Sequence, residues 1–565
     1  MSSLRFSVCG ATWSAIGGGR WRRRIGLVGL TLALAVSGVR AAEQAGALSP
    51  RIDKLFGKWE VKDSPGVIVG IMQDGKMIHA RGYGMANLDH SVALTAETIS
   101  ESGSVAKQFT AAAVALLAVR GKLSLDDPIG KHLPEMSDAF RAVTVKMLLN
   151  HTGGVRDIHG LNDLLGRPSY SSPHTNDEAV RILSRQKTLN FEPGTEYLYS
   201  NGGYILAAAI VERVSGKGFG AFCATELFAP RGMKRTTWRD DFEAVIPGRA
   251  AGYARRGSAY RIDMPYSNLV GNGGLLTTVG DLLAWTTSLD GAKGEWGEVV
   301  KLLQTPSKLK DGRVLGYGLG LTVGEYGGLP EIGHGGSTSG YQTYLMRFPT
   351  KGLAIAVLGN AADFGSSVAA HNLASMILNV RAPRAVPVKQ EASIAGLAGM
   401  YHSEQADDIL RVAVRDDKLS VGGAELVSTG PMTFANSSGQ TTYVFSEFGS
   451  GGQAAKLTVT SKNGVLAYAA KSMAKPTAAA LAAYTGTYAS EELGVSVMIA
   501  EEKGKLAVVS WPGLPAAGEP TFADGFMFRN GWHGTFTRDA NGKVTGLEAT
   551  NASGRCRRVK FVRQG

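Results

Sequence analysis

A serine and a lysine three residues apart, at the start of an alanine-rich stretch, constrain this chain more than any other feature. Ser104-Val-Ala-Lys107 precedes a run from Gln108 to Arg120 in which strong helix formers predominate, and Gly121 supplies a stop signal. Residues three apart share a helix face, so the amine of Lys107 is expected within reach of the Ser104 hydroxyl. A serine hydroxyl becomes a nucleophile when a neighbouring group removes its proton. The pair therefore predicts a nucleophile at a helix N-terminus, where unpaired backbone N–H groups can polarise a substrate.

Two further segments place polar side chains at turns. Tyr199-Ser-Asn201 follows a Pro-Gly turn and precedes an apolar run, so both side chains are expected on a loop that faces a cleft. His334-Gly-Gly-Ser337 lies in a predicted strand–turn–strand unit, and its glycines let a ligand approach the backbone. Taken alone, each segment is better explained by ordinary structure: a capped surface helix, a stabilised turn and a capped strand histidine, respectively. Together, and in this order, they predict one catalytic site.

The three segments resemble the motifs of the serine β-lactamase and penicillin-recognising enzyme family, in its class C-like esterase and peptidase branch. That family carries Ser-x-x-Lys, Tyr-x-Asn and a Lys/His-x-Gly strand, and the match extends over roughly residues 50–380. Residues 148–154 (Leu-Leu-Asn-His-Thr-Gly-Gly) and 272–278 (Asn-Gly-Gly-Leu-Leu-Thr-Thr) agree with further signatures. The resemblance implies acyl transfer with Ser104 as nucleophile. Lys107 and Tyr199 would share the role of base, and which of them takes the proton stays open.

The resemblance also implies a set of substrate-binding residues, namely Asn201, His334, Gly335, Gly336 and Ser337. Asn201 would orient Lys107 or the substrate amide, and the N–H groups of Ser104 and Ser337 would hold the oxyanion. His334 stands where β-lactamases usually have a lysine, and a histidine is mostly neutral near pH 7. A free carboxylate is then held less tightly and a substrate amine is repelled less. D-aminopeptidases and some esterases and D-peptidases fit this better than β-lactamases do. His151 is expected to be a buried structural histidine.

Hydrophobic patterning predicts an α+β catalytic domain over residues 42–380. Residues 66–81 predict a hairpin, helices are expected between about 104 and 215, and strands return near 341–359 before a last helix near 364–380. Strands at both ends with helices between them favour one antiparallel sheet with helices and an all-helical region. The resemblance implies the same β-lactamase/transpeptidase-like fold. The proline-rich, basic residues 381–392 predict a linker.

Two similar segments follow the linker. Residues 397–401 (Leu-Ala-Gly-Met-Tyr) recur as 484–488 (Tyr-Thr-Gly-Thr-Tyr), and short alternating strands follow each. Two small antiparallel β-barrel domains are therefore predicted, over 393–478 and 479–565, with spacers or shields as the alternative interpretation. This domain order is similar to that of bacterial D-aminopeptidases, whose last barrel sends a loop into the catalytic cleft. Here the loop is expected at 520–525, where Asp524 would pair with a substrate ammonium; an ordinary solvated Asp-Gly turn is the alternative.

The first 41 residues predict an export signal. Arg20-Trp-Arg-Arg-Arg24 precedes an apolar run over 25–39, and small residues stand where a signal peptidase cleaves. The run is shorter than the roughly 20 residues that cross a bilayer. We therefore expect an exported, periplasmic or secreted protein with no stable membrane span after signal removal; a retained anchor is the alternative.

Charge and composition exclude some classes of partner. The net charge is +12, but six positive residues lie within 1–41, where no acidic residue stands, which leaves a dispersed +6. Nucleic-acid binding is not expected from that distribution. Cysteine and histidine do not cluster at metal spacing, so neither a metal nor another cofactor is expected. A disulfide between Cys223 and Cys556 is not indicated, and the sequence leaves a homodimer open.

The sequence thus predicts a serine hydrolase that works through an acyl-enzyme. First among its activities is an aminopeptidase that releases N-terminal D-amino acids from small peptides, amides or esters. An esterase or D,D-peptidase on the same scaffold is the alternative within this class. A penicillin-binding sensor module, acylated without turnover, is the alternative from another class, and the presence of Lys107, Tyr199 and Asn201 argues against it.

Overall fold

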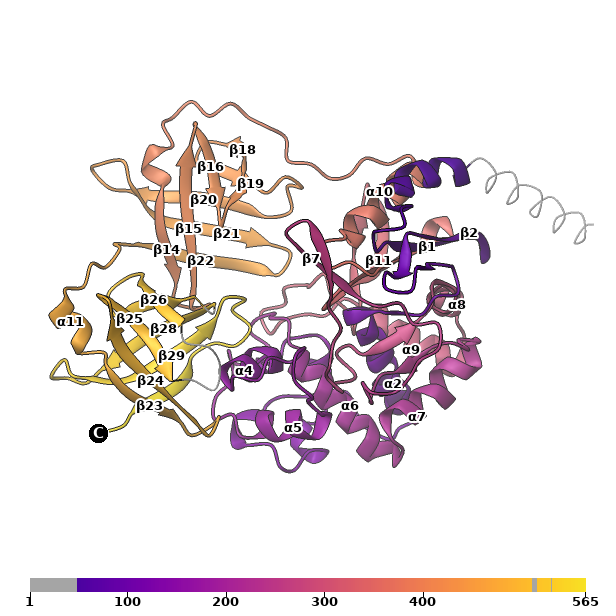
Figure 1. The fold of residues 1–565 in the computed structure, drawn as a ribbon, viewed down its shortest axis with the longest axis horizontal. Coiled ribbons are helices and arrows are strands. Elements are labelled where there is room, and N and C mark those ends of the chain that lie inside the picture. Colours follow the sequence, from indigo (N-terminus) through magenta and orange to yellow (C-terminus); the bar gives the residue numbers. More distant parts are fainter. Residues whose placement is uncertain (1–47, 511–515, 530) are drawn as a thin grey trace, which may run out of the picture. The chain divides into compact units, whose positions relative to one another are not determined.

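The computed structural model describes residues 48–510, 516–529 and 531–565, so the predicted signal segment at 1–41 lies outside the described residues. The chain forms two units, Met1–Leu55 and Phe56–Gly565. Residues 48–55 of the first unit are helical, and the second unit carries the elements described below (Figure 1). Within the described ranges, no helix has the length and apolar character that crossing a bilayer requires.

A six-stranded antiparallel sheet joins the two ends of the predicted catalytic domain. β1 (Val67–Gln73) and β2 (Lys76–Tyr83) form the predicted hairpin. The order across the sheet is β10 (Thr322–Tyr326), β11 (Leu329–Thr338), β12 (Tyr341–Phe348), β13 (Leu353–Gly359), β1 and β2. Every residue of β13 is buried, because α8 (Val279–Leu289) and α10 (Ser366–Leu378) both pack against that strand. The sequence of β13 is correspondingly a continuous apolar run rather than an alternating one.

Helices between β2 and β10 form the predicted helical region. α2 (Lys107–Val119) is buried along most of its length, because its alanines let α6 (Asn201–Ser215) and α9 (Gly294–Gln304) approach closely. The other helices of this region are α3 (Val145–Leu149), α4 (Ile158–Leu164), α5 (Asn176–Ser184) and α7 (Phe219–Cys223). Short strands accompany them: β3 (Met85–Asn87), β4 (Val92–Ala93), β5 (Ser100–Glu101), β6 (Thr237–Trp238), β7 (Tyr253–Arg256), β8 (Ala259–Ile262) and β9 (Leu275–Thr277).

A nine-stranded antiparallel sheet with a core of its own follows residue 392. Its order is β17-β16-β15-β14-β22-β21-β20-β19-β18, so that β17 and β18 stand at its two ends. The bounds are β14 (Gly399–Ser403), β15 (Asp408–Arg415), β16 (Lys418–Val421), β17 (Ala424–Glu425), β18 (Val427–Gly430), β19 (Thr433–Ala435), β20 (Thr442–Phe448), β21 (Ala454–Ser461) and β22 (Gly464–Lys471).

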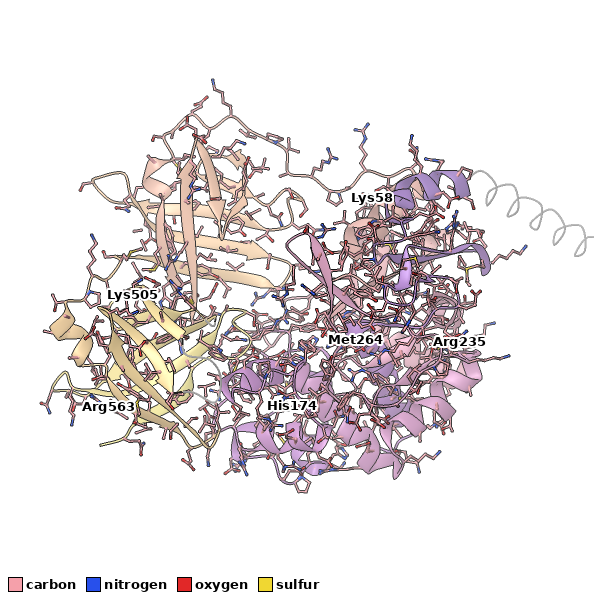
Figure 2. All side chains as sticks on the ribbon, viewed as in Figure 1. Lys58, His174, Arg235, Met264, Lys505 and Arg563 are labelled. Carbon is pink, nitrogen blue, oxygen red and sulfur yellow. The ribbon has the colours of Figure 1, made fainter. Side chains whose placement is uncertain are left out.

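An eight-stranded closed barrel comes last, drawn in yellow in Figure 1. After the short helix α11 (Ala478–Ala482), its strands are β23 (Gly486–Ser490), β24 (Val495–Glu502), β25 (Lys505–Ser510), β26 (Ala516–Pro520), β27 (Gly525–Phe528), β28 (Trp532–Arg538), β29 (Val544–Asn551) and β30 (Val559–Arg563). Lys505 is exposed on the barrel surface (Figure 2), whereas aromatic side chains fill the interior. The apolar core of the barrel is continuous with that of the helical region.

The predicted fold class is confirmed. An antiparallel sheet with helices is followed by two antiparallel β-structures, of which the last closes into a barrel and the first pairs as a nine-stranded sheet. The three sheets lie within the ranges predicted for the three domains, and the exact domain boundaries stay predictions. Cys223 and Cys556 are both buried and free.

Candidate active site

Ser104 lies in a short 3-10 turn, η2 (Gly103–Ala106), which links β5 to α2. The sequence predicted an α-helix from Ser104 onward, whereas the α-helix begins at Lys107. The predicted contact is nevertheless made, since Lys107 Nζ lies 3.1 Å from Ser104 Oγ. Gly103 has a φ of +50°, a conformation that favours glycine. A Cβ at that position would also stand 2.6 Å from the Ser337 nitrogen, so the turn needs glycine for space as well.

The fully buried Lys107 amine contacts two carbonyl oxygens besides Ser104. Nζ lies 2.8 Å from Oδ1 of Asn201 and 2.7 Å from the main-chain oxygen of Asn272. Burial lowers the pKa of Lys107 well below its ordinary value, with Asp157 opposing the shift and Arg555 adding to it. A neutral amine has two hydrogens and one lone pair. With both hydrogens donated to the carbonyl oxygens, the lone pair is left for the Ser104 hydroxyl proton.

Asp157 holds Asn201 in the orientation that Lys107 needs. Its Oδ2 accepts hydrogen bonds from the main-chain N–H of Asn201 at 3.0 Å and from Asn201 Nδ2 at 2.8 Å. The amide nitrogen of Asn201 therefore faces Asp157 and the amide oxygen faces Lys107. Sequence reasoning missed both Asp157 and Asn272. Asn272 stands in a segment that resembled the family, but it contributes a main-chain oxygen, which any residue type supplies.

Tyr199 hydrogen-bonds to Ser104 from the turn that precedes α6. Burial raises the pKa of its hydroxyl above the ordinary value, although the bond to Ser104 opposes that shift. Tyr199 is therefore a neutral phenol, able to pass a proton but poorly suited to remove one. The ring of the buried His151 lies 4.3 Å from the Tyr199 ring, and His151 Nδ1 accepts the Ser200 N–H at 3.1 Å. These contacts fit the prediction that His151 is a buried structural histidine.

His334 is buried on β11 and electrically neutral. Its Nδ1 lies 2.6 Å from the Gly335 carbonyl oxygen, which can only accept, so Nδ1 carries the proton. Its Nε2 then accepts from the Tyr317 hydroxyl at 3.0 Å. Burial first, and Lys107 second, lower the pKa of His334 to about 3. The third motif therefore offers the substrate no cation.

The main chain of β11 touches the turn that holds Ser104. A Cβ on Gly336 would lie 2.0 Å from the Ser102 oxygen and 3.0 Å from the Ser104 nitrogen. Only glycine permits this approach, and the approach places the main chain of Ser337 beside that of Ser104. The two predicted oxyanion donors are thus neighbours in space.

These residues line a cavity of about 720 Å³, roughly half of whose wall is polar. The predicted residues in its wall are Ser104, Tyr199, Asn201, His334, Gly335, Gly336 and Ser337. Glu101 and Arg239 also reach the wall, where they pair with each other at 3.1 Å. Asp163 is a further carboxylate in the wall; desolvation in the cleft, and then Asp157, raise its pKa to about 6. Sequence reasoning missed Asp163.

The structure corrects the expectation for Asp524. Its carboxylate accepts hydrogen bonds from Tyr484 at 2.9 Å and Arg538 at 2.7 Å, and it lies outside the cavity wall. Asp524 has a φ of 61° in the turn between β26 and β27, which is the ordinary Asp-Gly turn. The barrel does enter the cavity, but through residues 531–532 and 551–555. The charged side chain that the barrel brings to the cavity wall is therefore Arg555 rather than Asp524.

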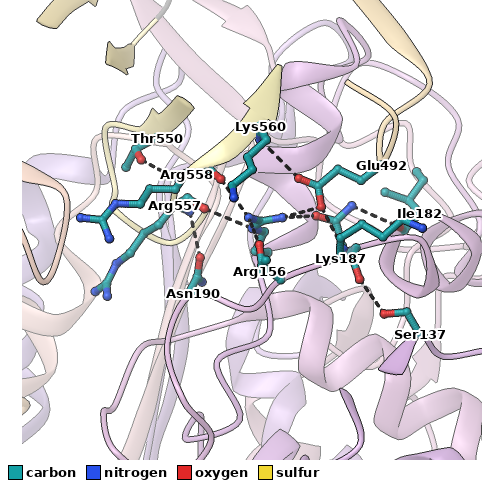
Figure 3. A network of polar contacts seen from close by, with 12 residues as sticks. Ser137, Arg156, Ile182, Lys187, Asn190, Glu492, Thr550, Arg557, Arg558 and Lys560 are labelled. Atoms are coloured by element: carbon teal, nitrogen blue, oxygen red, sulfur yellow. Dashed lines mark hydrogen bonds and ion pairs between the residues drawn. The ribbon is translucent and has the colours of Figure 1, made fainter. Parts of the chain in front are cut away.

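Arg156 fixes this barrel loop to the helical region (Figure 3). Its side chain is 1% exposed and all five of its N–H groups donate. The acceptors are Glu492 Oε2 (2.9 Å), Gln186 Oε1 (2.8 Å), Thr188 Oγ1 (2.8 Å) and the main-chain oxygens of Arg557 and Arg558 (both 3.1 Å). The Arg555 carbonyl in turn accepts from the Asp157 N–H at 3.0 Å and from Asn190 Nδ2 at 2.8 Å. The loop thus bonds directly to the residue that orients Asn201.

Comparison with known sequences finds two kinds of match. The family model described as Beta-lactamase matches residues 53–378. A D-aminopeptidase of Brucella anthropi is 30% identical over 335 residues, which cover 59% of this chain and 63% of the relative. A D-aminopeptidase of Brucella canis is 30% identical over 336 residues, covering 58% and 62%. The match thus spans less than two thirds of the length of these relatives.

Solved structures share the fold. An octameric penicillin-binding protein homologue from Pyrococcus abyssi has a TM-score of 0.54 and 24% identity, over 75% of this chain and 99% of that one. The structure of SurE with D-Leu has a TM-score of 0.53 and 23% identity, over the same shares. The family model covers more than half of the 565 residues, and the three motifs that resembled it converge on one cavity. The chain therefore belongs to the Beta-lactamase family.

Proposed function

We propose that this protein is a serine hydrolase that forms an acyl-enzyme on Ser104. The observation that carries the proposal is the arrangement around the Lys107 amine, whose two carbonyl acceptors leave its lone pair for the Ser104 proton. A buried amine with a lowered pKa is a competent base near neutral pH. The presence of Lys107, Tyr199 and Asn201 together argues against a protein that only binds its ligand, because such a protein need not keep all three.

The reaction follows from these positions. Ser104 Oγ bonds to the substrate carbonyl carbon as its proton passes to Lys107, and the N–H groups of Ser104 and Ser337 hold the oxyanion. Tyr199, which lines the cavity beside Ser104, passes its proton to the leaving amine or alcohol as the bond to the carbonyl breaks, and takes up the proton held by Lys107, so that both groups are neutral again. Water then attacks the ester as Lys107 takes its proton, and Lys107 returns that proton to Ser104 Oγ as the acid departs.

The proposed substrates are small peptides, amides or esters with a free N-terminal D-residue. The relatives matched at 30% identity are D-aminopeptidases. A neutral His334 does not repel a substrate ammonium, and Asp163 offers that ammonium a carboxylate in the cavity wall. Asp163 thereby takes the role that the sequence assigned to Asp524.

The test is p-nitroaniline release from D-Ala and L-Ala p-nitroanilides and from their N-acetylated counterparts. We expect cleavage of the free-amine D compound, loss of that cleavage in Ser104→Ala, and no change in Ser184→Ala. Ser184 is a matched control because its hydroxyl bonds to the Arg181 oxygen on α5, outside the cavity wall. Ser104-dependent cleavage of a p-nitrophenyl ester without cleavage of any anilide would identify an esterase. Anilide cleavage that survives in Ser104→Ala would refute the nucleophile itself.

A further inference from the structure

We propose that Arg555 binds a carboxylate of the substrate, so that the cavity selects short peptides with a free C-terminal carboxylate. This inference deepens the proposed aminopeptidase activity and rests on it. It concerns the side of the substrate that leaves, for which the third motif of this chain supplies no positive charge.

Arg555 brings a positive charge to the reaction centre from the barrel. Its guanidinium carbon lies 4.8 Å from the centre of the Tyr199 ring, on which it stacks, and the side chain lines the cavity. Tyr199 bonds to Ser104, so the guanidinium stands one side chain away from the nucleophile. The side chain is half-buried, which leaves it open to a ligand in the cavity.

Arg555 differs from its neighbours in having no carboxylate within ion-pair distance among the residues that the structure describes. Arg557 pairs with Glu196 at 3.1 Å, and Arg239, the other arginine in the cavity wall, pairs with Glu101. The buried Asp157 is nearby, but its oxygens accept from Asn201 and from the His159 N–H. A guanidinium that faces a cavity without a partner is suited to a planar anion, which it can bind with two parallel hydrogen bonds.

Hydrogen bonds fix the main chain that carries this cation before any substrate binds. The Arg555 carbonyl accepts two hydrogen bonds from the helical region, and Arg156 binds the carbonyls two and three residues later. The next residue, Cys556, packs so closely on α4 that a Cβ at Gly160 would lie 2.8 Å from its Cβ. A preorganised charge loses little freedom on binding and therefore contributes more to affinity.

The cavity thus presents opposite charges to the two ends of a short substrate. Asp163 is available for an ammonium and Arg555 for a carboxylate, while His334 contributes no charge. A dipeptide with both ends free matches that pattern better than its C-terminal amide. The β-lactamases that this chain resembles usually carry a carboxylate-binding cation in the third motif. Here a residue of the barrel would supply the positive charge that the third motif lacks.

The experiment measures binding without turnover, by calorimetric titration of the Ser104→Ala protein with D-Ala-Gly and with D-Ala-Gly amide. We expect the dipeptide to bind about tenfold more tightly than its amide, as for a charge-assisted contact in a partly open site. In Ser104→Ala/Arg555→Gln the ratio should fall to within about twofold, and Arg555→Lys should restore part of it. Lys560→Gln, which removes an exposed charge from β30, is the control and should leave the ratio unchanged.

Three results would overturn the inference: equal binding of the two peptides to Ser104→Ala, a ratio that Arg555→Gln leaves intact, or no binding of either peptide. Each is separate from a failure of the proposed function, because the anilide assay decides that function with wild-type protein and an uncharged leaving group. Unchanged thermal unfolding of Arg555→Gln would show that the variant is folded, and Arg555→Lys supplies a second folded comparison.

Discussion

Replacing Arg156 by methionine should loosen the barrel from the helical region without unfolding either. Methionine keeps much of the side-chain volume but makes none of the five hydrogen bonds of the guanidinium. The change would leave the carboxylate of Glu492, which is 5% exposed, without its cation. It would also leave two main-chain oxygens of the barrel loop without donors.

The size of the effect follows from what remains around Glu492. Removing one partner of a buried ion pair costs about 3–5 kcal/mol. Glu492 keeps the N–H groups of Lys187 at 3.0 Å and Lys560 at 3.4 Å, so we take the lower value, about 3 kcal/mol. At 1.4 kcal/mol for each factor of ten, the equilibrium for opening this interface rises about 150-fold.

Two buried cysteines allow the opening to be measured in native conditions. Cys556 lies at the interface itself, and burial raises the pKa of its thiol to about 12, so it is inert while the interface is closed. Cys223 is equally buried but belongs to α7. In a Cys9→Ser background, labelling by dithiobis-nitrobenzoate should accelerate about 150-fold at Cys556 in Arg156→Met, while labelling of Cys223 stays at the wild-type rate.

The reasoning would be refuted by a Cys556 rate equal to that of wild type, or by equal acceleration at both cysteines. The double variant Arg156→Met/Glu492→Met is the sharper control, because it leaves no buried charge. It should label more slowly than Arg156→Met alone. If the two variants label equally fast, the unpaired carboxylate is not what opens the interface.

Three other changes test the reaction centre. Lys107→Ala should lower kcat for D-Ala p-nitroanilide at least about a thousandfold with unchanged circular dichroism, because Tyr199, which also bonds to Ser104, is a neutral phenol and a poor base; a loss below about tenfold would contradict this. Asp163→Asn should raise KM for the free-amine substrate alone. In wild type, kcat/KM for that substrate should fall as the pH drops through about 6, because the Asp163 carboxylate takes up a proton there and no longer pairs with the substrate ammonium. The pH profile of the variant should lack this fall. If both proteins have the same pH profile, Asp163 does not bind the ammonium. Gly336→Ala should lower kcat at least about 100-fold, because the added methyl group pushes β11 away from the Ser102 oxygen. If active-site titration shows that this variant has the full activity of wild type, the close contact does not exist.

The groups proposed to react could be located from the sequence because their geometry is mostly local. Ser104 and Lys107 are one turn apart, so their contact survives even though the turn is 3-10 rather than α-helical. Tyr199 and Asn201 flank the start of α6, which apolar patterning also located. The neutrality of His334 was expected from the ordinary pKa of histidine, and burial lowers that pKa further in the structure.

The substrate side of the site could not be predicted in the same way, because it depends on docking. Asp524 and Arg555 lie in different turns of one barrel, and local chemistry does not say which turn faces the cavity. That choice is made by contacts such as Arg156 with Glu492, 336 residues apart in sequence. The contact of Asn272 with Lys107 could not be predicted for a different reason: it is made by a main-chain oxygen, which every residue type has.

The cavity wall contributed by the barrel has a consequence for biosynthesis. A ribosome synthesises a chain from its N-terminus, and domains fold in the order in which they emerge. The hydroxyl and amine of the reaction centre can meet soon after the first sheet has formed, whereas the strands on either side of residues 551–555 are among the last to be made. The residues proposed to react would therefore be assembled before the part of the cavity wall that selects the substrate. A nascent or partly assembled molecule could carry out acyl transfer with an open cleft, and the barrel's arrival would narrow what it accepts.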